Sequence, residues 1–143
     1  MKNLNTRKKG FALFEIILVI AVLAIILSLG MTVDLSSFRR DTFLTEQWKL
    51  ASILQRARSR AMSNMFDTNH GVCYTPPDYI IFKGDDYTDG ESAPANTNIT
   101  ITFPSSPIVF DRLTGKTTGA TIHLTDGIKS ADITINNEGT IDW

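Results

Sequence analysis

The pattern of apolar and polar positions divides the chain into three stretches with different periods. Residues 11–33 are apolar apart from a few small or hydroxyl residues and one carboxylate, Glu15. A helix of this length would be about 34 Å long, which is enough to cross the hydrocarbon core of a bilayer. The first stretch therefore predicts a transmembrane helix over residues 11–33.

In the second stretch, residues 34–66, apolar residues recur at steps of three and four, as in a helix with one buried face. We expect one long helix from Phe11 to about Met65, whose soluble half is residues 34–66. The alternative is a kink near residues 34–37, because Asp34 and Ser36 could cap a restarted helix. The stripe expected to be buried comprises Leu50, Leu54, Ala57, Ala61 and Met65.

In the third stretch, residues 67–143, the apolar period changes to two, which is typical of half-buried antiparallel strands. Turn residues separate the strands, and the longest break, residues 84–96, is expected to be a loop. The fold class is therefore α+β: a long N-terminal α-helix packed on a small antiparallel β-sheet domain, the head. Strands are predicted over residues 71–75, 79–83, 98–103, 108–110, 120–124, 131–136 and 140–143.

Charge is distributed unevenly between the two halves of the chain. Residues 1–65 hold 10 Lys or Arg against 4 Asp or Glu, whereas residues 66–143 hold 4 against 11. The positive residues before the apolar stretch predict that the N-terminus stays in the cytoplasm and that the head is exported. The acidic head makes nucleic acid an unlikely partner.

Glu15 is the residue of the apolar stretch that needs a physical explanation. A carboxylate at mid-helix costs about 2.5–3.5 kcal/mol in a bilayer, and such residues usually have a partner. Cleavage after Gly10 would give Phe11 a free α-amine with a pKa near 8, a cation for the Glu15 of a neighbouring helix. An uncleaved signal anchor, or a secretory signal cleaved near Gly30, are the alternatives.

A short basic leader ending in Gly10, then Phe11, Glu15 and an apolar run to Val33, resembles the signal of type IV pilins and type II secretion pseudopilins. The resemblance implies that residues 1–10 are a leader, removed between Gly10 and Phe11 by a prepilin peptidase that also N-methylates Phe11. It implies that Glu15 acts in subunit docking, and that the partners are the peptidase, other pilin subunits and an inner-membrane assembly platform. The implied location is the inner membrane, in a single pass, with a periplasmic or extracellular head. The chain lacks the mid-helix proline of many pilins.

A second resemblance covers about residues 45–143. The helical stretch 50–61 and the order of Ile108, Gly115, Ile133 and Gly139 in the C-terminal half are similar to the minor pseudopilin H family and its minor-pilin relatives. This predicts a non-enzymatic minor subunit of a type II secretion pseudopilus or a type IV pilus. The alternatives are a DNA-binding minor pilin of a competence pilus and a single-pass anchored exoprotein.

Two groups of residues are candidates for chemistry, and no cofactor is expected. His70 and Cys73, with His123, could hold zinc or form a nucleophile–base pair, but an inert cysteine is the favoured interpretation. Asp85, Asp86 and Asp89 are weak candidates for calcium, because their spacing does not fit the helix–loop–helix calcium pattern. Three arginines, Arg56, Arg58 and Arg60, are expected to form a solvated helix face.

Overall fold

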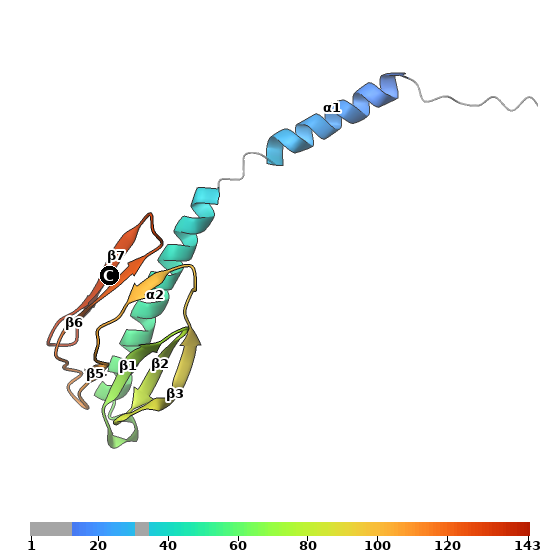
Figure 1. The fold of residues 1–143 in the computed structure, drawn as a ribbon. Coiled ribbons are helices and arrows are strands. Elements are labelled where there is room, and N and C mark those ends of the chain that lie inside the picture. The colour runs from blue at the N-terminus through green and yellow to red at the C-terminus, as the bar shows by residue number, and fades with distance from the viewer. Residues whose placement is uncertain (1–12, 31–34) are drawn as a thin grey trace, which may run out of the picture. The chain divides into compact units, whose positions relative to one another are not determined.

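The computed structural model describes residues 13–30 and 35–143 (Figure 1), with the side chains of residues 29–40, 88 and 89 left out of the description. The chain divides into two compact units, one ending at Ser37 and the other running from Phe38 to Trp143. Each unit is described by itself. The predicted leader, residues 1–10, and the predicted cleavage site, Gly10 and Phe11, lie outside the described residues.

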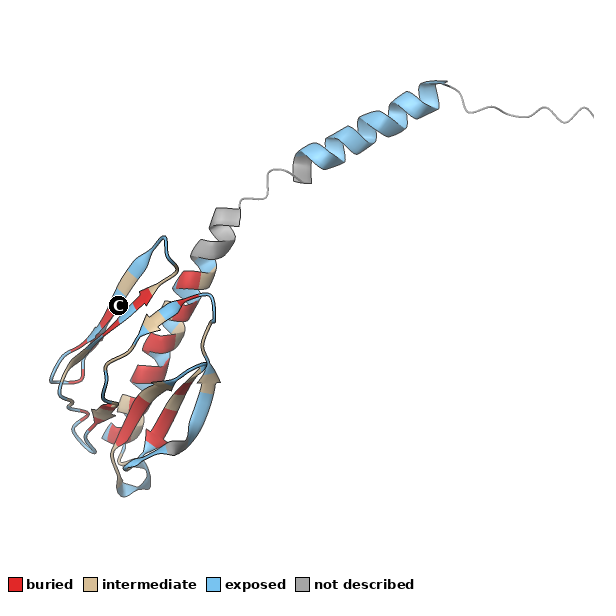
Figure 2. Ribbon diagram, in the orientation of Figure 1, coloured by how far each residue is buried: buried red, intermediate tan, exposed pale blue. Residues whose placement is uncertain are grey.

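The first unit contains helix α1, Leu13–Gly30, which lies within the predicted helical stretch. Over residues 13–28 its apolar side chains are exposed on every side, as Figure 2 shows. Within the described residues, no helix has both the length and the apolarity required to cross a membrane. The predicted transmembrane stretch, residues 11–33, extends beyond α1 at both ends into residues that the structure does not describe.

Helix α2 runs from Leu35 to Met62 and ends three residues before Met65, the predicted end of the single long helix. Residues 31–34, where the predicted kink begins, lie outside the described residues. After α2 the chain turns at Asn64, whose left-handed φ of 52° ends the α-helical path, and a 3₁₀ helix, Met65–Asp67, follows. Met65 therefore falls beyond α2 and is exposed, contrary to the prediction that it is buried.

Two four-stranded antiparallel sheets, rather than the single small sheet predicted, pack against α2 in the second unit (Figure 1). Sheet A has the order β3-β2-β1-β5, and sheet B has the order β4-β6-β7-β8. Figure 1 shows α2 between the hairpin of β1 and β2 and the hairpin of β6 and β7. The strands are β1 His70–Thr75, β2 Asp78–Lys83, β3 Asp86–Pro94, β4 Thr100–Thr102, β5 Ile108–Phe110, β6 Ala120–Thr125, β7 Ser130–Ile135 and β8 Ile141–Asp142.

Strand β3 corrects the prediction that residues 84–96 form a loop. It pairs antiparallel with β2, with Ile81 opposite Glu91 and Tyr79 opposite Ala93, and it is an edge strand of sheet A. The register shifts once, between Phe82 and Lys83. An edge strand with mostly exposed side chains needs no alternation of apolar residues, because the backbone ladder holds it. Gly90 permits the close pairing, since a Cβ there would lie 2.5 Å from the carbonyl oxygen of Ile81.

One hydrophobic core fills the space between α2 and the two sheets. The predicted stripe Leu50, Leu54, Ala57 and Ala61 is fully buried, and the alternating residues of β6 and β7 point into the same core. Burying each large aliphatic side chain contributes about 1.5–3 kcal/mol. Every buried apolar residue described lies between Phe43 and Ile141, so the second unit has a core of its own.

Candidate assembly site and exposed surfaces

Glu15 lies in the first turn of α1 and is the only ionisable residue of that helix. The partial positive charge of a helix N-terminus favours a carboxylate at this position. Large apolar side chains surround it along the helix, and those of Leu13, Phe14 and Ile16 are exposed. Gly10 and Phe11 lie outside the described residues, so their cleavage, the methylation of Phe11 and its pairing with Glu15 stay predictions.

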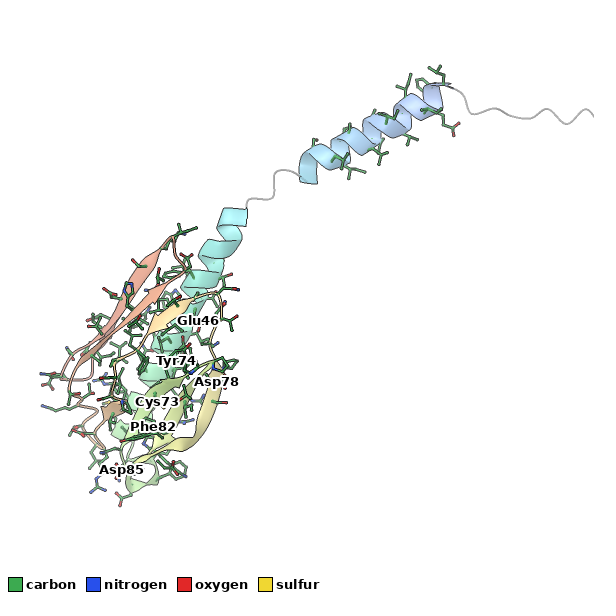
Figure 3. The ribbon with its side chains drawn as sticks, in the orientation of Figure 1. Glu46, Cys73, Tyr74, Asp78, Phe82 and Asp85 are labelled. Atoms are coloured by element: carbon green, nitrogen blue, oxygen red, sulfur yellow. The ribbon has the colours of Figure 1, made fainter. Side chains whose placement is uncertain are left out.

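A buried hydrogen bond joins α2 to sheet A inside the head. The hydroxyl of Tyr79 in β2 donates to Glu46 Oε1 of α2 at 2.8 Å, and both side chains are buried. Burial, together with the bond to Glu46, raises the pKa of Tyr79 well above its usual value. Lys49 lies 3.7 Å from the other Glu46 oxygen and donates to the carbonyl of Pro94 at the end of β3. Figure 3 places Glu46 on α2.

A second link joins α2 to the edge strand β3 through Glu91. Its two carboxylate oxygens lie 2.5 Å from Arg56 Nη1 and 2.7 Å from Arg60 Nη2. The hydrogen bond from Arg60, with the charge of both arginines, lowers the pKa of Glu91. Arg58 donates to the carbonyl of Glu138 at 3.2 Å. These arginines form a partly solvated helix face, since the Arg56 side chain is 53% exposed, but each one also binds an acceptor on another part of the head, which the sequence did not predict.

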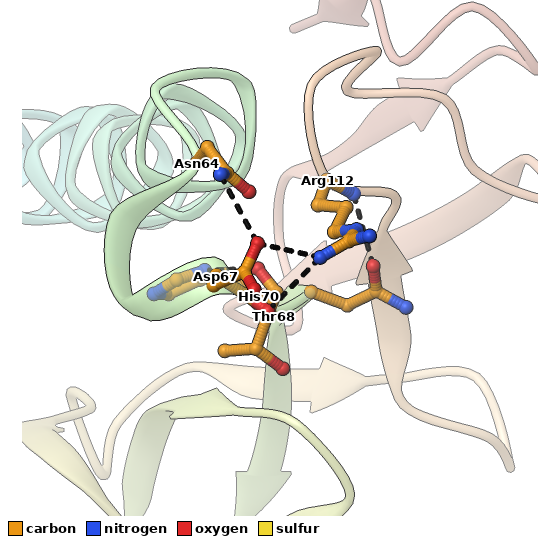
Figure 4. A network of polar contacts seen from close by, with 6 residues as sticks. Asn64, Asp67, Thr68, His70 and Arg112 are labelled. Carbon is orange, nitrogen blue, oxygen red and sulfur yellow. Dashed lines mark hydrogen bonds and ion pairs between the residues drawn. The ribbon is translucent and has the colours of Figure 1, made fainter.

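Beyond the carboxyl end of α2, the turn that contains the 3₁₀ helix is joined to the turn of residues 111–115 by polar contacts, as Figure 4 shows. Arg112 Nη1 lies 2.6 Å from Asp67 Oδ1 in the 3₁₀ helix, and the backbone N–H of Arg112 donates to Asn69. The N–H of Leu113 donates to the carbonyl of Ala61 in the last turn of α2, at 2.9 Å. These bonds fix residues 111–115 against residues 61–69.

Four apolar side chains are exposed at the end of α2 and on the two turns beyond it: Met62, Met65, Phe66 and Leu113. We call them the carboxyl-end cluster. Phe66 is 67% exposed with a φ of 61°, and Leu113 is 63% exposed with a φ of 66°. A left-handed backbone at a bulky residue costs about 1–3 kcal/mol, and such strain persists where surrounding contacts enforce it and is concentrated at functional sites.

A pocket of about 200 Å³ lies beside Phe66, between the end of α2 and sheet A. Its lining includes His70, Phe82 and Lys83. The Lys83 ammonium lies 5.0 Å from the centre of the Phe66 ring, and the Phe66 and His70 rings stack at 6.3 Å. Burial, with the nearby charges of Arg60 and Lys83, lowers the pKa of His70 although its ring bonds the carbonyl of Thr68.

A second exposed cluster lies near the amino end of the described part of α2. It comprises Leu44, Trp48 and Trp143, and we call it the tryptophan cluster. The two indole rings meet edge to face with 5.5 Å between their centroids, although Trp48 remains 60% exposed. This contact joins α2 to the residue that follows the last strand, β8.

The residues considered for chemistry do not come together. His70 and Cys73 are three positions apart on β1, so their side chains point to opposite faces of sheet A. His123 lies in sheet B, where its Nδ1 is 2.5 Å from Oδ1 of Asp132. Burial raises the pKa of the Cys73 thiol, whose sulfur lies 3.8 Å from the carbonyl oxygen of Tyr87. Such a thiol is not activated for nucleophilic attack.

The calcium candidates lie on the β2–β3 hairpin. Asp85 is in the turn, where Figure 3 labels it, and Asp86 begins β3, while the side chain of Asp89 is not described. Across the described residues, no three His, Cys, Asp or Glu side chains are grouped in a way that could hold a metal ion.

The sequence of the helix and strands described above matches a known protein family. The family described as type II transport protein GspH matches residues 48–139, which run from Trp48 in α2 to the turn after β7. The chain belongs to the GspH family. No curated protein and no solved structure matches it. Members of the GspH family are structural pseudopilins rather than enzymes, so the chain is a minor pilin of the pseudopilin type and its family implies other pseudopilin subunits as partners.

Sequence reasoning missed the carboxyl-end cluster and the tryptophan cluster as surfaces. The sequence pattern places Met65 on the buried stripe. The available signal was spacing: Trp48 and Met62 are two heptads apart, so they recur on nearly the same helix face, away from Leu50 and Leu54.

Proposed function

We propose that this member of the GspH family is a minor subunit of a type II secretion pseudopilus or a type IV pilus. It is inserted in the inner membrane through the apolar stretch that contains α1, with its head on the far side. It is cleaved after Gly10, N-methylated at Phe11 and assembled through that stretch. The observation that carries the proposal is α1 itself, a helix whose apolar side chains are exposed all round and whose one charge is Glu15.

A helix that is apolar on every side needs an apolar environment, which lipid or a bundle of like helices can supply. Glu15 makes lipid an unfavourable environment for this helix, because a carboxylate in lipid has no counter-ion. The α-amine created by cleavage at Phe11 is a cation at neutral pH and lies a few residues from Glu15 in the sequence. Pairing of one subunit's amine with another's Glu15 favours the bundle over lipid. Processing and assembly are thereby coupled electrostatically.

Mass spectrometry of the protein purified from membranes of its producing cells tests the processing step. We expect an N-terminal peptide that begins at Phe11 and carries one added methyl group. A mature chain that retains Met1, or that begins at any residue other than Phe11, would contradict the proposal. A chain in which Gly10 is replaced by a bulky residue, Gly10→Leu, serves as the control and should keep its leader.

Replacing Glu15 tests the assembly step separately. Glu15→Leu should leave cleavage intact and lower incorporation into sheared filaments, because the α-amine of the neighbour loses its partner. Glu15→Asp keeps the charge one methylene shorter and should retain part of the incorporation. Incorporation is measured by immunoblotting of the filament fraction against the membrane fraction. Normal incorporation of Glu15→Leu would show that the pairing is not required.

A further inference from the structure

Strand β3 contributes little to the core of the head, although with nine residues it is the longest strand described. None of its described side chains is buried, whereas β1, β2, β6 and β7 each bury two or three residues. Ala93 is partly buried against the core, and the ring of Tyr87, which is 43% exposed, meets the ring of Phe82 edge to face. A segment with so few buried apolar contacts opens at a lower free energy than the core does.

The backbone ladder holds β3 on one side only. β3 is an edge strand of sheet A, with β2 between it and β1 (Figure 1). Its pairing with β2 is continuous from Gly90 to Pro94, and the register shifts where β2 passes from Phe82 to Lys83. A shift of this kind disrupts the ladder locally. The regular part of the ladder is therefore five residues long, from Gly90 to Pro94.

Three basic side chains of α2 hold the same five residues of β3. Arg56 and Arg60 bind the two carboxylate oxygens of Glu91, and Lys49 donates to the carbonyl of Pro94. We call Glu91 and its two arginines the clasp. Their side chains are between 23% and 53% exposed, so water and dissolved ions reach both ion pairs. The strength of the clasp therefore depends on the salt concentration.

Opening of β3 would change the surface of the head without removing its core. No buried residue of the described core belongs to β3, so the remaining strands and α2 keep their packing. The pocket of about 200 Å³ would lose the wall that Gly90 and Glu91 provide. The outer edge of β2 would lose its partner, and a free strand edge presents unpaired N–H and C=O groups.

We propose that β3 is a releasable edge strand, which leaves β2 while the rest of the head stays folded, and that the clasp determines how often it does so. β3 thereby controls access to the edge of β2 and to the pocket. The inference goes beyond the proposed function, because it concerns the head alone and depends neither on cleavage after Gly10 nor on assembly through α1.

Hydrogen–deuterium exchange of the full-length chain in detergent micelles, measured by mass spectrometry, tests the inference. Peptides that cover β3 should exchange faster than those that cover β6 and β7, because release of β3 does not require unfolding of the core. Raising NaCl from about 20 mM to about 500 mM should increase the exchange rate of β3 about threefold, since salt screens exposed ion pairs. The exchange rates of β6 and β7 should stay the same.

Removing the negative charge of the clasp gives a second readout. Glu91→Gln should raise the exchange rate of β3 roughly fivefold, as expected for the loss of two exposed ion pairs, and should remove most of the response to salt. Glu138→Gln is the matched control, because Glu138 is also an exposed carboxylate and pairs with Lys116 at 3.2 Å in the turn between β7 and β8. This control should leave the exchange of β3 unchanged.

Three results would overturn the inference. If β3 exchanges as slowly as β6 and β7, it opens only when the whole head unfolds. If neither salt nor Glu91→Gln changes the exchange rate of β3, the clasp does not control its release. If Glu91→Gln accelerates exchange equally in all strands, Glu91 stabilises the head as a whole and not the attachment of β3.

Discussion

Tyr79 and Glu46 form the most enclosed polar contact described between α2 and a sheet. Tyr79→Phe removes the hydroxyl that donates to Glu46 and leaves a buried carboxylate without this donor. We expect the free energy of unfolding to fall by about 1–3 kcal/mol, the usual result of leaving a buried acceptor unsatisfied. This change in the free energy of unfolding is measured by urea denaturation, monitored by circular dichroism. Tyr74→Phe, which removes a hydroxyl from the neighbouring, partly exposed ring, is the control and should change stability less.

Tyr79→Phe should also change how the stability of the head depends on alkaline pH. Because the pKa of Tyr79 is raised in the folded head, the unfolded chain loses this proton first, near pH 10. The stabilisation is therefore complete below pH 10 and is lost as pH rises above it, by up to about 1.4 kcal/mol per pH unit. Tyr79→Phe should show a smaller loss of stability between pH 9 and pH 11 than the unmodified chain. Equal losses would indicate that Tyr79 ionises freely in the folded head.

Leu113 offers a test of backbone strain. Leu113→Gly removes a side chain that is mostly exposed and relieves a left-handed φ, so stability should be unchanged or higher by up to about 1 kcal/mol. Leu44→Gly is the matched control: it also removes an exposed leucine, but from within α2, and should be destabilising by about 1 kcal/mol. Thermal unfolding of both variants decides the point. A clear loss of stability in Leu113→Gly would mean that the leucine stabilises the folded head itself.

At the residue scale, the sequence was sufficient to predict the burial of residues that follow a repeating pattern. The buried stripe Leu50, Leu54, Ala57 and Ala61 follows from a period of 3.6 residues. The left-handed conformations of Phe66 and Leu113 could not be predicted, because neither residue favours that region, and tertiary hydrogen bonds hold the turns that contain them. The partners of Arg56 and Arg60 were missed for a similar reason, since Glu91 reaches them only after β3 has paired with β2.

Among the elements, the turn that joins β7 to β8 depends on a glycine in close contact with another turn. Gly139 has a φ of 76°, and a Cβ there would lie 2.0 Å from the carbonyl oxygen of Gly115. Gly127, in the β6–β7 turn, has a φ of 84° and no atom within 4 Å of such a Cβ. Gly127→Ala should therefore cost about 1 kcal/mol, from the backbone alone.

Gly139→Ala should cost at least about 2 kcal/mol more than Gly127→Ala, because the methyl group must also displace the 111–115 turn. Denaturant unfolding of the two variants gives the difference directly. Similar losses in both would mean that the 111–115 turn moves away at little cost.

Strands with a buried alternating face could be predicted from the sequence, and β6 and β7 were placed within one residue of their observed ends. Strand β3 could not be predicted, because its sequence has the composition of a loop: Asp-Tyr-Thr-Asp-Gly-Glu-Ser-Ala-Pro. Its strand conformation comes from the free edge of β2, which is a property of the sheet and not of residues 86–94. Asp85, Asp86 and Asp89 were weak calcium candidates only because that segment was expected to be a loop.

For the whole molecule, the sequence predicted one long N-terminal helix followed by β-strands, and in the described residues the helices do precede the strands. The GspH family match covers the part of this order from residue 48 to residue 139. The division of the strands between two sheets was not predictable, because alternation indicates a buried face without indicating which strand lies beside it. The residues of the predicted cleavage site lie outside the described structure, so that site still depends on the sequence pattern alone.

The edge-to-face contact between Trp48 and Trp143 has a spectroscopic consequence. These are the two tryptophans of the sequence, so all of the indole fluorescence of the protein originates from one corner of the head. Its emission should respond to solvent access at that corner and to the anchoring of the last strand on α2. The protein therefore carries an intrinsic optical probe there, and dilution, denaturant or a binding partner could each be followed by its emission without a label.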